Sequence, residues 1–167
     1  MPFEEISVKD IKENFIKLIA DDYMLITAGN TDSFNTMTAS WGGVGEMWGC
    51  DVSIIAVRPT RYTFGFLEES DFYTLCFFDK EKGKKVHAVC GSKSGRDVNK
   101  ASLAEITPFS IGDSVAFEEA RTVMLCRKLY SHLLDPDRFL DPTIEKWYKN
   151  DYHKIYAGEI VKTLIRK

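Results

Sequence analysis

Several short runs of the chain consist of β-branched, aromatic and other apolar residues, and turn-forming residues separate them. Such a run is typical of a buried or half-buried β-strand. Gly29 and Asn30, for example, form a turn signal directly after the first run. The pattern predicts strands over residues 23–28, 34–41, 52–58, 72–78, 115–134 and 153–165. Within the long fifth run, Glu118 and Glu119 predict a bend or a change of register.

Apolar residues recur at helical spacing in two places. Near the N-terminus, Ser7 is a suitable N-cap with Asp10 three residues later, and one face then carries Val8, Ile11, Phe15, Leu18 and Ile19. Residues 80–90 predict a second helix, with Gly91 as its C-terminal stop. Residues 93–113 are polar and interrupted by glycine and proline, and residues 135–150 carry two prolines and predict one or two short helices.

The order of these elements indicates the fold class. The predicted strands cluster before and after the middle helix and do not alternate with helices, which argues against a doubly wound α/β sheet. A mainly β fold, an antiparallel barrel or sandwich with peripheral helices, fits better. Because the chain contains no repeat, low-complexity tract or linker, residues 1–167 are expected to form a single domain.

Composition narrows the class of protein. Hydrophobic residues make up 44% of the chain and charged residues 28%, which excludes disorder, collagen and a coiled-coil rod. The formal net charge of −3 lacks the bulk basic field that non-specific nucleic-acid binding requires, although a local basic patch stays open. The aromatic content of 13% suits either a core or the lining of a site for a flat ligand.

The N-terminal sequence, the length of the apolar runs and the cysteine spacing predict a cytoplasmic protein. The opening ten residues are acidic and carry no secretory signal, and the longest purely apolar run, residues 54–57, is too short to cross a bilayer. Cys50, Cys76, Cys90 and Cys126 form no C-x-x-C pair and match no zinc pattern. We therefore expect reduced thiols that act as small hydrophobes, in a cytoplasmic protein without a membrane partner.

The first segment with candidate chemistry is N-T-M-T-A-S-W-G-G, residues 35–43. Its hydroxyl groups, its glycines and the aromatic face of Trp41 could contact a ligand where a strand enters a Gly-rich loop. The alternative is a strand that runs into a turn, with Trp41 in the core.

The second segment is R-P-T-R-Y-T, residues 58–63, in which Arg58 and Arg61 flank a turn stiffened by proline. Guanidinium groups suit phosphate or carboxylate ligands. The alternative is a solvated turn whose arginines pair with Glu68 and Glu69.

The third segment is G-S-K-S-G-R-D, residues 91–97, which combines hydroxyl residues, two glycines and two cations in the manner of an anion-binding nest. The order of residues is not that of a Walker A loop, and the chain contains no G-x-G-x-x-G. The alternative is a flexible loop.

The three histidines, His87, His132 and His153, show no metal-binding spacing, and no G-x-S-x-G motif supports a serine triad. We therefore expect no metal and no hydrolytic triad. His87 is expected to be a surface or packing residue in the middle helix.

Taken in order, these segments resemble the flavin reductase-like family, whose fold is an FMN-binding split barrel, and its flavoredoxin-type members in particular. The resemblance covers most of the chain. The segments that carry it are N-T-M-T-A-S-W-G at 35–42, V-R-P-T-R-Y-T at 57–63, S-G-R-D-V-N-K at 94–100, E-A-R at 119–121, C-R-K-L-Y at 126–130, D-Y-H at 151–153 and G-E-I at 158–160.

The resemblance implies a homodimer of split barrels with one FMN in each subunit. It also implies the cofactor-binding residues. These are Asn35, Thr36, Thr38, Ala39, Ser40 and Trp41 at the flavin ring and ribityl chain, Arg58, Thr60, Arg61, Tyr62 and Thr63 at a second side, Lys93, Ser94 and Arg96 at the phosphate, and His132 at the flavin. His153 is the candidate catalytic residue on the substrate side.

Two departures from the family pattern are visible. Cys50 and Asp51 stand where relatives often carry a proline, and Asn99 replaces the usual Asp of S-G-R-D-x-D-K. With these departures, the sequence does not identify the residues that would contact the nicotinamide of NAD(P)H.

The leading hypothesis is a flavin oxidoreductase or electron carrier that moves electrons from NAD(P)H or a protein donor to a small-molecule flavin or a redox protein. The alternatives are a non-catalytic FMN-binding module and a small barrel that contacts protein or an oligonucleotide. The net acidic charge disfavours the last of these.

Overall fold

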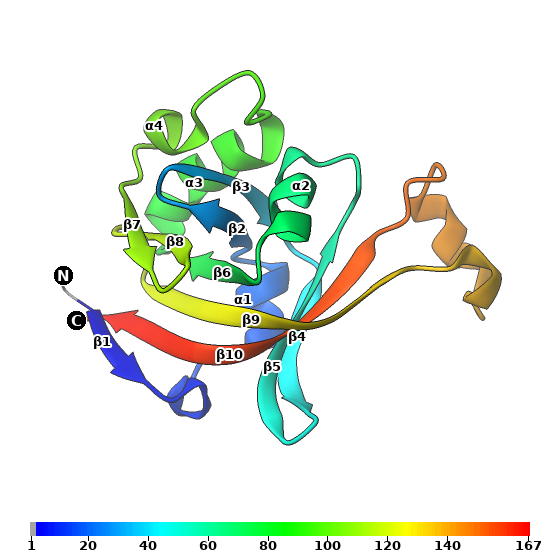
Figure 1. Ribbon diagram of the computed structural model, residues 1–167, viewed down its shortest axis with the longest axis horizontal. Coiled ribbons are helices and arrows are strands. Elements are labelled where there is room, and N and C mark those ends of the chain that lie inside the picture. Colours follow the sequence, from blue (N-terminus) through cyan, green and yellow to red (C-terminus); the bar gives the residue numbers. More distant parts are fainter. Residues whose placement is uncertain (1–2) are drawn as a thin grey trace.

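A curled antiparallel sheet organises the chain in the computed structural model, which describes residues 3–167. In that range the sheet has eight strands in the order β3-β2-β6-β9-β10-β5-β4, with β1 on the far part of β10. The strands are β1 (Phe3–Ile6), β2 (Met24–Asn30), β3 (Ser33–Ala39), β4 (Gly42–Met47), β5 (Cys50–Val57), β6 (Phe72–Phe77), β9 (Thr122–Leu133) and β10 (Lys154–Arg166) (Figure 1). A separate hairpin pairs β7 (Pro108–Ile111) with β8 (Ser114–Phe117).

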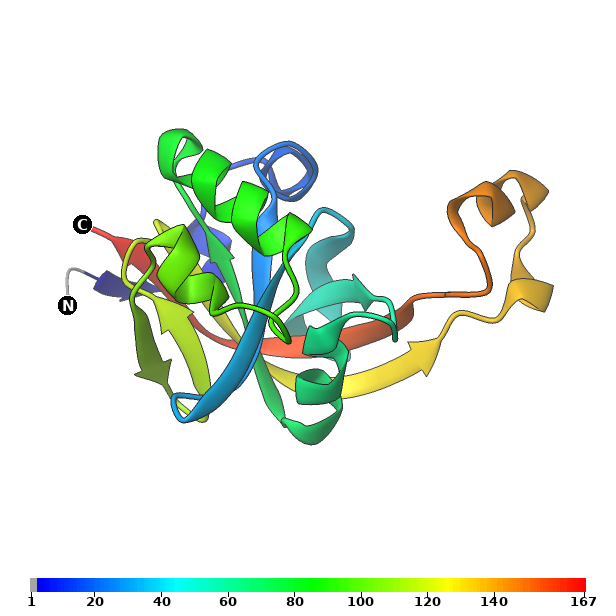
Figure 2. The ribbon, with the colours of Figure 1, turned by 90° about the horizontal axis from the view of Figure 1, so that it is seen from above.

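The helices lie around this sheet. They are α1 (Phe15–Ala20), α2 (Tyr62–Glu69), α3 (Lys80–Ser92) and α4 (Lys100–Ala104), with 3-10 turns at Val8–Asp10, Pro136–Arg138 and Pro142–Trp147. The last two turns belong to residues 134–152, here called the arm, which extends away from the barrel between β9 and β10 (Figure 2). The predicted mainly β fold, an antiparallel split barrel with peripheral helices, is confirmed.

Successive side chains of each strand point to opposite faces of the sheet, and apolar side chains on both faces form two separate cores. Along β2, Met24 and Ile26 point into the barrel interior, where they pack with Tyr73 and Tyr156, whereas Leu25 packs on the outer face. The outer core joins the sheet to α3, α4 and the β7–β8 hairpin. Side chains alternate across a strand, so residues covered on both faces give the nearly continuous apolar runs seen in the sequence.

The predicted N-terminal helix is two short helices. Ser7 caps only the 3-10 turn, by accepting a hydrogen bond from the Lys9 N–H at 3.2 Å. Asn14 then starts α1, because its Oδ1 accepts from Ile16 N and Lys17 N at 2.9 and 3.2 Å. Asn14 is thus a second N-cap among the apolar residues that recur at helical spacing, and it divides the expected helix in two.

Several elements were not predicted. Residues 42–43, expected to be a Gly-rich loop, begin β4, and the turn expected after Pro59 continues into α2. Within α2, Gly65 lowers helix propensity, and Arg61 makes no side-chain cap hydrogen bond. Gly91 lies within α3 and does not end it, since the helix runs to Ser92. β1, α4 and β7 were also missed.

The break predicted at Glu118 and Glu119 is confirmed, since these residues separate β8 from β9. The expected short helices between residues 135 and 150 are present as the two 3-10 turns of the arm. The four thiols are free; three are buried, and Cys50 is partly exposed. Among residues 3–167, no helix is both long and apolar enough to span a membrane.

Candidate functional site

The segments singled out in the sequence meet near the end of β3. A pocket of about 240 Å³ lies between β3, the start of α2 and the loop that follows α3. The predicted site residues that line it are Thr38, Thr60, Arg61, Tyr62, Thr63, Lys93, Ser94 and Arg96. The fold therefore places the second and third sequence segments against part of the first.

Four cations surround this pocket. Arg61, Lys93 and Arg96 are exposed, whereas Lys100 is buried, with 7% of its surface accessible. Within residues 3–167, none of the four forms an ion pair with a carboxylate. The Arg96 guanidinium lies over the Tyr62 ring, 4.7 Å from its centroid. Uncompensated cations of this kind favour an anionic ligand, and ammonium and guanidinium groups bind phosphate well.

Lys100 is a site residue that was not predicted. Its Nζ donates to the carbonyl oxygens of Thr36 at 2.9 Å and Cys90 at 3.0 Å. Burial lowers the pKa of Lys100, and the Arg61 guanidinium acts in the same direction. In the sequence, Lys100 follows Asn99, whose side chain caps α4, so the local signal was a helix start. Only the tertiary structure brings its ammonium group to the pocket.

A second pocket, of about 230 Å³, continues the first toward β4 and shares Met37, Thr38 and Arg61 with it. We call the two pockets together the groove. The predicted residues that line this second part are Thr38, Ala39, Ser40, Trp41, Arg58, Arg61 and His153. Sequence reasoning missed Tyr23, Met37 and Ala56. Tyr23 and Ala56 lie outside the motifs, and Met37 lies inside the first motif but has an apolar side chain with no evident chemistry.

Trp41 forms part of the wall of the groove. It is 39% exposed, so the alternative that placed it in the core is wrong. Its ring centroid lies 4.9 Å from that of His153 and 5.6 Å from that of Trp147 in the arm. This end of the groove therefore carries the aromatic cluster, whereas Lys93, Arg96 and Lys100 line only the other end.

Arg58 connects the groove to the arm. Its guanidinium forms an ion pair with Asp151, donates to the Trp147 carbonyl at 2.8 Å and lies 5.1 Å from the centroid of the Tyr148 ring. The predicted alternative, in which the arginines of this turn pair with Glu68 or Glu69, is wrong for Arg58. Glu68 instead pairs with Lys154 and accepts a hydrogen bond from the Tyr156 hydroxyl.

His153 is buried beside Arg58, with 8% of its surface exposed, and its Nδ1 lies 3.0 Å from the Tyr148 hydroxyl. Burial lowers the pKa of His153 from its ordinary 6.5 to about 4, and the Arg58 guanidinium contributes in the same direction. The imidazole is therefore neutral at pH 7. It can form a hydrogen bond but carries no charge for a ligand.

The pKa of His153 predicts a loss of stability in acid. The unfolded chain takes up a proton near pH 6.5 and the folded chain only near pH 4, so stability is flat above pH 6.5 and falls between pH 6.5 and 4. We expect His153 to contribute about 1 to 2 kcal/mol to this fall, after allowance for partial screening by solvent. Urea unfolding at pH 7.0 and 4.5 should show a smaller difference for His153→Asn. An equal difference in the two proteins would contradict the assignment.

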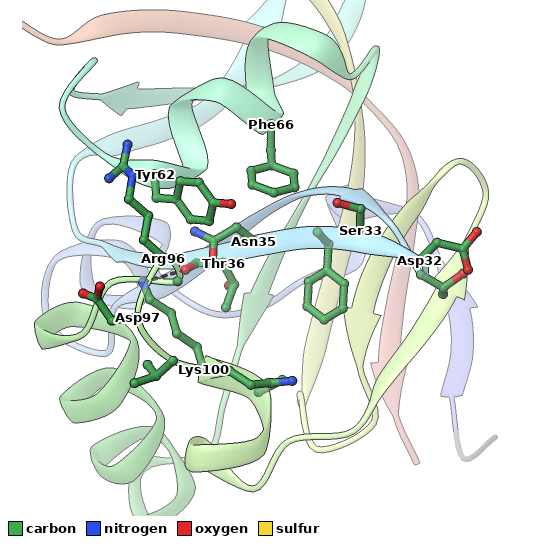
Figure 3. Close-up of a pocket in the computed structure, with 15 residues that line it drawn as sticks. Asp32, Ser33, Asn35, Thr36, Tyr62, Phe66, Arg96, Asp97 and Lys100 are labelled. Atoms are coloured by element: carbon green, nitrogen blue, oxygen red, sulfur yellow. Dashed lines mark hydrogen bonds between the residues drawn. The ribbon is translucent and has the colours of Figure 1, made fainter.

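Asn35 and Thr36 lie beside the groove and line a neighbouring pocket of about 550 Å³ between β3, α2 and α4 (Figure 3). The Asn35 Nδ2 donates to the Thr63 hydroxyl at 2.7 Å, which links β3 to α2. The Thr36 hydroxyl accepts from Thr27 at 2.9 Å and donates to the Ile26 carbonyl at 3.3 Å. Both side chains are thus engaged within the protein. Their hydrogen bonds hold β3, which lines the groove, against α2 and β2.

Besides Asn35 and Thr36, which line the neighbouring pocket, His132 is a predicted site residue that the structure does not bring to the groove. It lies near the end of β9 and is exposed, with its ring centroid 6.4 Å from that of Tyr130. It pairs in register with Ile155 of β10, outside the pockets that form the groove.

The chain was compared with models of known protein families and with curated protein sequences. The family described as "Flavin reductase like domain" matches residues 16–167 of the chain. No curated protein sequence matches it.

Solved structures show the same fold. An FMN-binding domain of a flavin reductases-like enzyme from Shewanella baltica superposes with a TM-score of 0.69 at 13% identity, over 98% of this chain and 77% of that one. A flavoredoxin from Methanosarcina acetivorans gives a TM-score of 0.66 at 19% identity, over 95% and 74% of the two chains. A flavoredoxin of Desulfovibrio vulgaris gives 0.68 at 15% identity, over 98% and 76%.

Proposed function

Because the chain belongs to the flavin reductase-like domain family, we propose that it binds FMN in the groove and passes electrons through it, as a flavin reductase or as a flavoredoxin-like carrier. The observation that supports this most is the polarity of the groove. Lys93, Arg96 and Lys100, which have no carboxylate partner within residues 3–167, line one end only, and Trp41 and His153 line the other. FMN has a matching shape, with a phosphate at one end and a flat ring system at the other.

The residues of the groove fit the roles that such a ligand requires. Lys93, Arg96 and Arg61 would hold the phosphate, with the Ser94 hydroxyl as a further donor. Trp41 would cover an apolar part of the ring. Bound FMN would supply the redox chemistry, with NAD(P)H or a redox protein as the proposed electron donor. The protein would bind the ring, orient it and limit its contact with water.

Two measurements on the purified protein test the proposal. FMN and riboflavin should both bind, and riboflavin should bind at least about tenfold more weakly because it lacks the phosphate. Anaerobic titration with NADH and with NADPH should then bleach the flavin absorbance and identify the donor. Failure to bind FMN would overturn the proposal. Binding without reduction by either nucleotide would favour a protein donor or a non-catalytic FMN-binding module.

Lys93 provides a sharper test of the phosphate end. Lys93→Ala should weaken FMN binding about tenfold or more, because it removes a charge-assisted contact to the phosphate. Riboflavin affinity and the thermal midpoint should stay unchanged, since an exposed lysine contributes little to folding. Isothermal titration calorimetry with both ligands measures the difference. Lys17→Ala, at an exposed position on α1, is the matched control.

We also propose that the protein, as a single domain over residues 1–167, assembles as a homodimer. Large apolar side chains are exposed on the turn between β4 and β5 and along the outer part of β9. Trp48 is 62% exposed, Tyr130 is 53% exposed, and their ring centroids lie 6.3 Å apart. Leu129 and Leu133 are further apolar side chains exposed on β9. Large apolar side chains exposed in this way are typical of a protein interface. Pairing of two copies would also place the exposed His132 at that interface.

The homodimer is expected to weaken when this surface loses its largest side chain. Sedimentation velocity should give about twice the 19.1 kDa chain mass for the wild type, and Trp48→Ser should shift the population toward the monomer. Ile16→Ser removes an apolar side chain that is 79% exposed on α1 and should leave the mass unchanged. A monomeric wild-type protein would overturn this proposal.

A further inference from the structure

Tyr23 lies in the short connection between α1 and β2, beside the aromatic end of the groove. It lines that end of the groove, and on its other side it lines a separate cavity of about 500 Å³ next to α3. Met24 pairs with Ala39 at the start of β2, so Tyr23 lies one residue beyond the paired strands, near the segment that leads to Trp41. The fold therefore brings Tyr23 to the part of the groove proposed for the flavin ring.

The backbone of Tyr23 has a conformation that suits glycine. Its φ is 66°, in the left-handed region. Residues with a bulky side chain rarely adopt this region, and close to the end of a helix it is usually occupied by glycine or asparagine. An aromatic residue at this position therefore lowers the stability of the fold. Some other gain must offset this loss.

Helix capping does not account for the strained backbone. Glu105, for comparison, has a φ of 54° and ends α4, where its N–H donates to the carbonyl oxygens of Ala101 and Ser102. The N–H groups of Asp21 and Asp22 both donate to a carbonyl of α1, at Lys17. Within residues 3–167, the Tyr23 N–H makes no such backbone hydrogen bond. The left-handed conformation of Tyr23 thus satisfies no carbonyl of the preceding helix.

Packing inside the protein does not account for it either. Tyr23 is 41% exposed and belongs to neither of the two apolar cores, whereas the next residue, Met24, is fully buried in the barrel interior. The Tyr23 ring stands nearly perpendicular to the His87 ring at a centroid distance of 5.8 Å. The His87 Nδ1 in turn lies 3.1 Å from the Thr38 hydroxyl. These contacts hold the Tyr23 ring beside the groove and leave much of its surface free.

The free surface of Tyr23 suits the ring system of a flavin. Isoalloxazine is flat and partly apolar, and aromatic side chains bind such rings by stacking or by edge contacts. Trp41 lines the same part of the groove, whereas Lys93 and Arg96 line only the other part. A flavin with its phosphate at these two cations would therefore extend its ring toward Tyr23.

We propose that Tyr23 is a contact residue for the flavin ring, and that its strained backbone is retained because it holds the side chain at the groove. This inference rests on the proposed binding of FMN in the groove. It gives a role to a residue that lies outside every sequence motif. Because riboflavin has the same ring as FMN, Tyr23 should contribute equally to the binding of both, whereas Lys93 contributes to that of FMN alone.

Tyr23→Asn separates the contact from the strain, because asparagine tolerates a positive φ but has no aromatic ring. This variant should bind FMN and riboflavin each about tenfold more weakly than the wild type. Its thermal midpoint, measured without added flavin, should stay within about 2 °C of that of the wild type, because relief of strain compensates for the lost surface contacts. Calorimetric titration and thermal denaturation measure the two effects.

Tyr23→Phe is the matched control, since it keeps both the ring and the strained backbone, and it should retain the affinity for both flavins. Unchanged flavin affinity in Tyr23→Asn would overturn the inference, and so would a loss for FMN alone, which would place the residue at the phosphate. A fall of several degrees in the thermal midpoint of Tyr23→Asn would show that the side chain serves the fold instead. A wild-type protein that binds no flavin would overturn the proposed function itself, and titration of the unmodified protein shows this first.

Discussion

Replacing Gly158 with alanine is expected to lower the free energy of unfolding by about 3 kcal/mol, because the new methyl group has no space. A Cβ at this position would lie 2.5 Å from the Tyr73 hydroxyl oxygen and 2.8 and 2.9 Å from two carbons of the same ring. Tyr73 has no exposed surface and spans the barrel interior from β6 to β5, where its hydroxyl lies 2.6 Å from Ser53 Oγ. Neither the ring nor the strand can yield without disturbing both sheet and core.

This effect should be measured by thermal and urea denaturation. For a chain of this length the expected change corresponds to a fall of roughly 6 to 12 °C in the thermal midpoint. Gly45→Ala is the matched control, because Gly45 also lies in a strand and a Cβ there would meet nothing within 4 Å. A fall equal to that of the control would mean that Tyr73 can move.

Tyr73→Phe tests the cause in a double-mutant cycle. This change removes the nearest clashing atom but leaves the two ring carbons in place. The penalty of Gly158→Ala should therefore be smaller in the Tyr73→Phe background, without disappearing. Strict additivity would show that the two residues do not interact and would contradict the packing argument.

The strands were predictable because the two cores cover both faces of the sheet. Residues such as Leu25 and Cys76 are buried on the outer face, while their neighbours Ile26 and Leu75 are buried inside. Runs of this kind are apolar throughout, and they are visible without any knowledge of their partners. Which strands pair was not predictable, since register depends on contacts between distant segments, such as Gly158 with Ser53.

The elements that were missed have weak local signals. Residues 62–69 form α2 without a side-chain cap and with Gly65 in the interior, and they owe their stability to packing of Leu67 in the barrel core. In β4, two glycines begin the strand, and one of them, Gly42, has a φ of 153°, which residues with a side chain rarely adopt, and a Cβ there would lie 2.2 Å from the Ile54 carbonyl oxygen. In both elements, tertiary packing stabilises a helix or strand that the intrinsic propensities of its residues do not favour.

Sequence motifs made part of the candidate site predictable. Lys93, Arg96 and Arg61 lie in polar loops, where clustered cations are conspicuous in the sequence. Lys100 lies in a helix and looked like an ordinary helical residue. Its importance arises from its burial and its uncompensated charge, and neither property can be read from sequence spacing. The structure adds its ammonium group to the chemistry of the groove.

The tight contact between Gly95 and Asn35 predicts the largest effect on the binding of FMN. A Cβ on Gly95 would lie 1.9 Å from Asn35 Oδ1, 2.8 Å from its Cγ and 3.0 Å from a ring carbon of Tyr62. Asn35 is 5% exposed and bonded to Thr63, so it cannot turn away without breaking that hydrogen bond. The loop that carries Lys93, Ser94 and Arg96 would have to move instead.

Gly95→Ala is therefore expected to weaken FMN binding at least about a hundredfold, because several charge-assisted contacts would be lost together. Riboflavin, which lacks the phosphate, should lose much less affinity. Gly65→Ala is the control, since a Cβ at that position of α2 would meet nothing within 4 Å. Calorimetric titration of both ligands measures the ratio. If Gly95→Ala bound FMN as tightly as the wild type, the loop would not hold the phosphate, and the proposed orientation of FMN in the groove would have to be reversed.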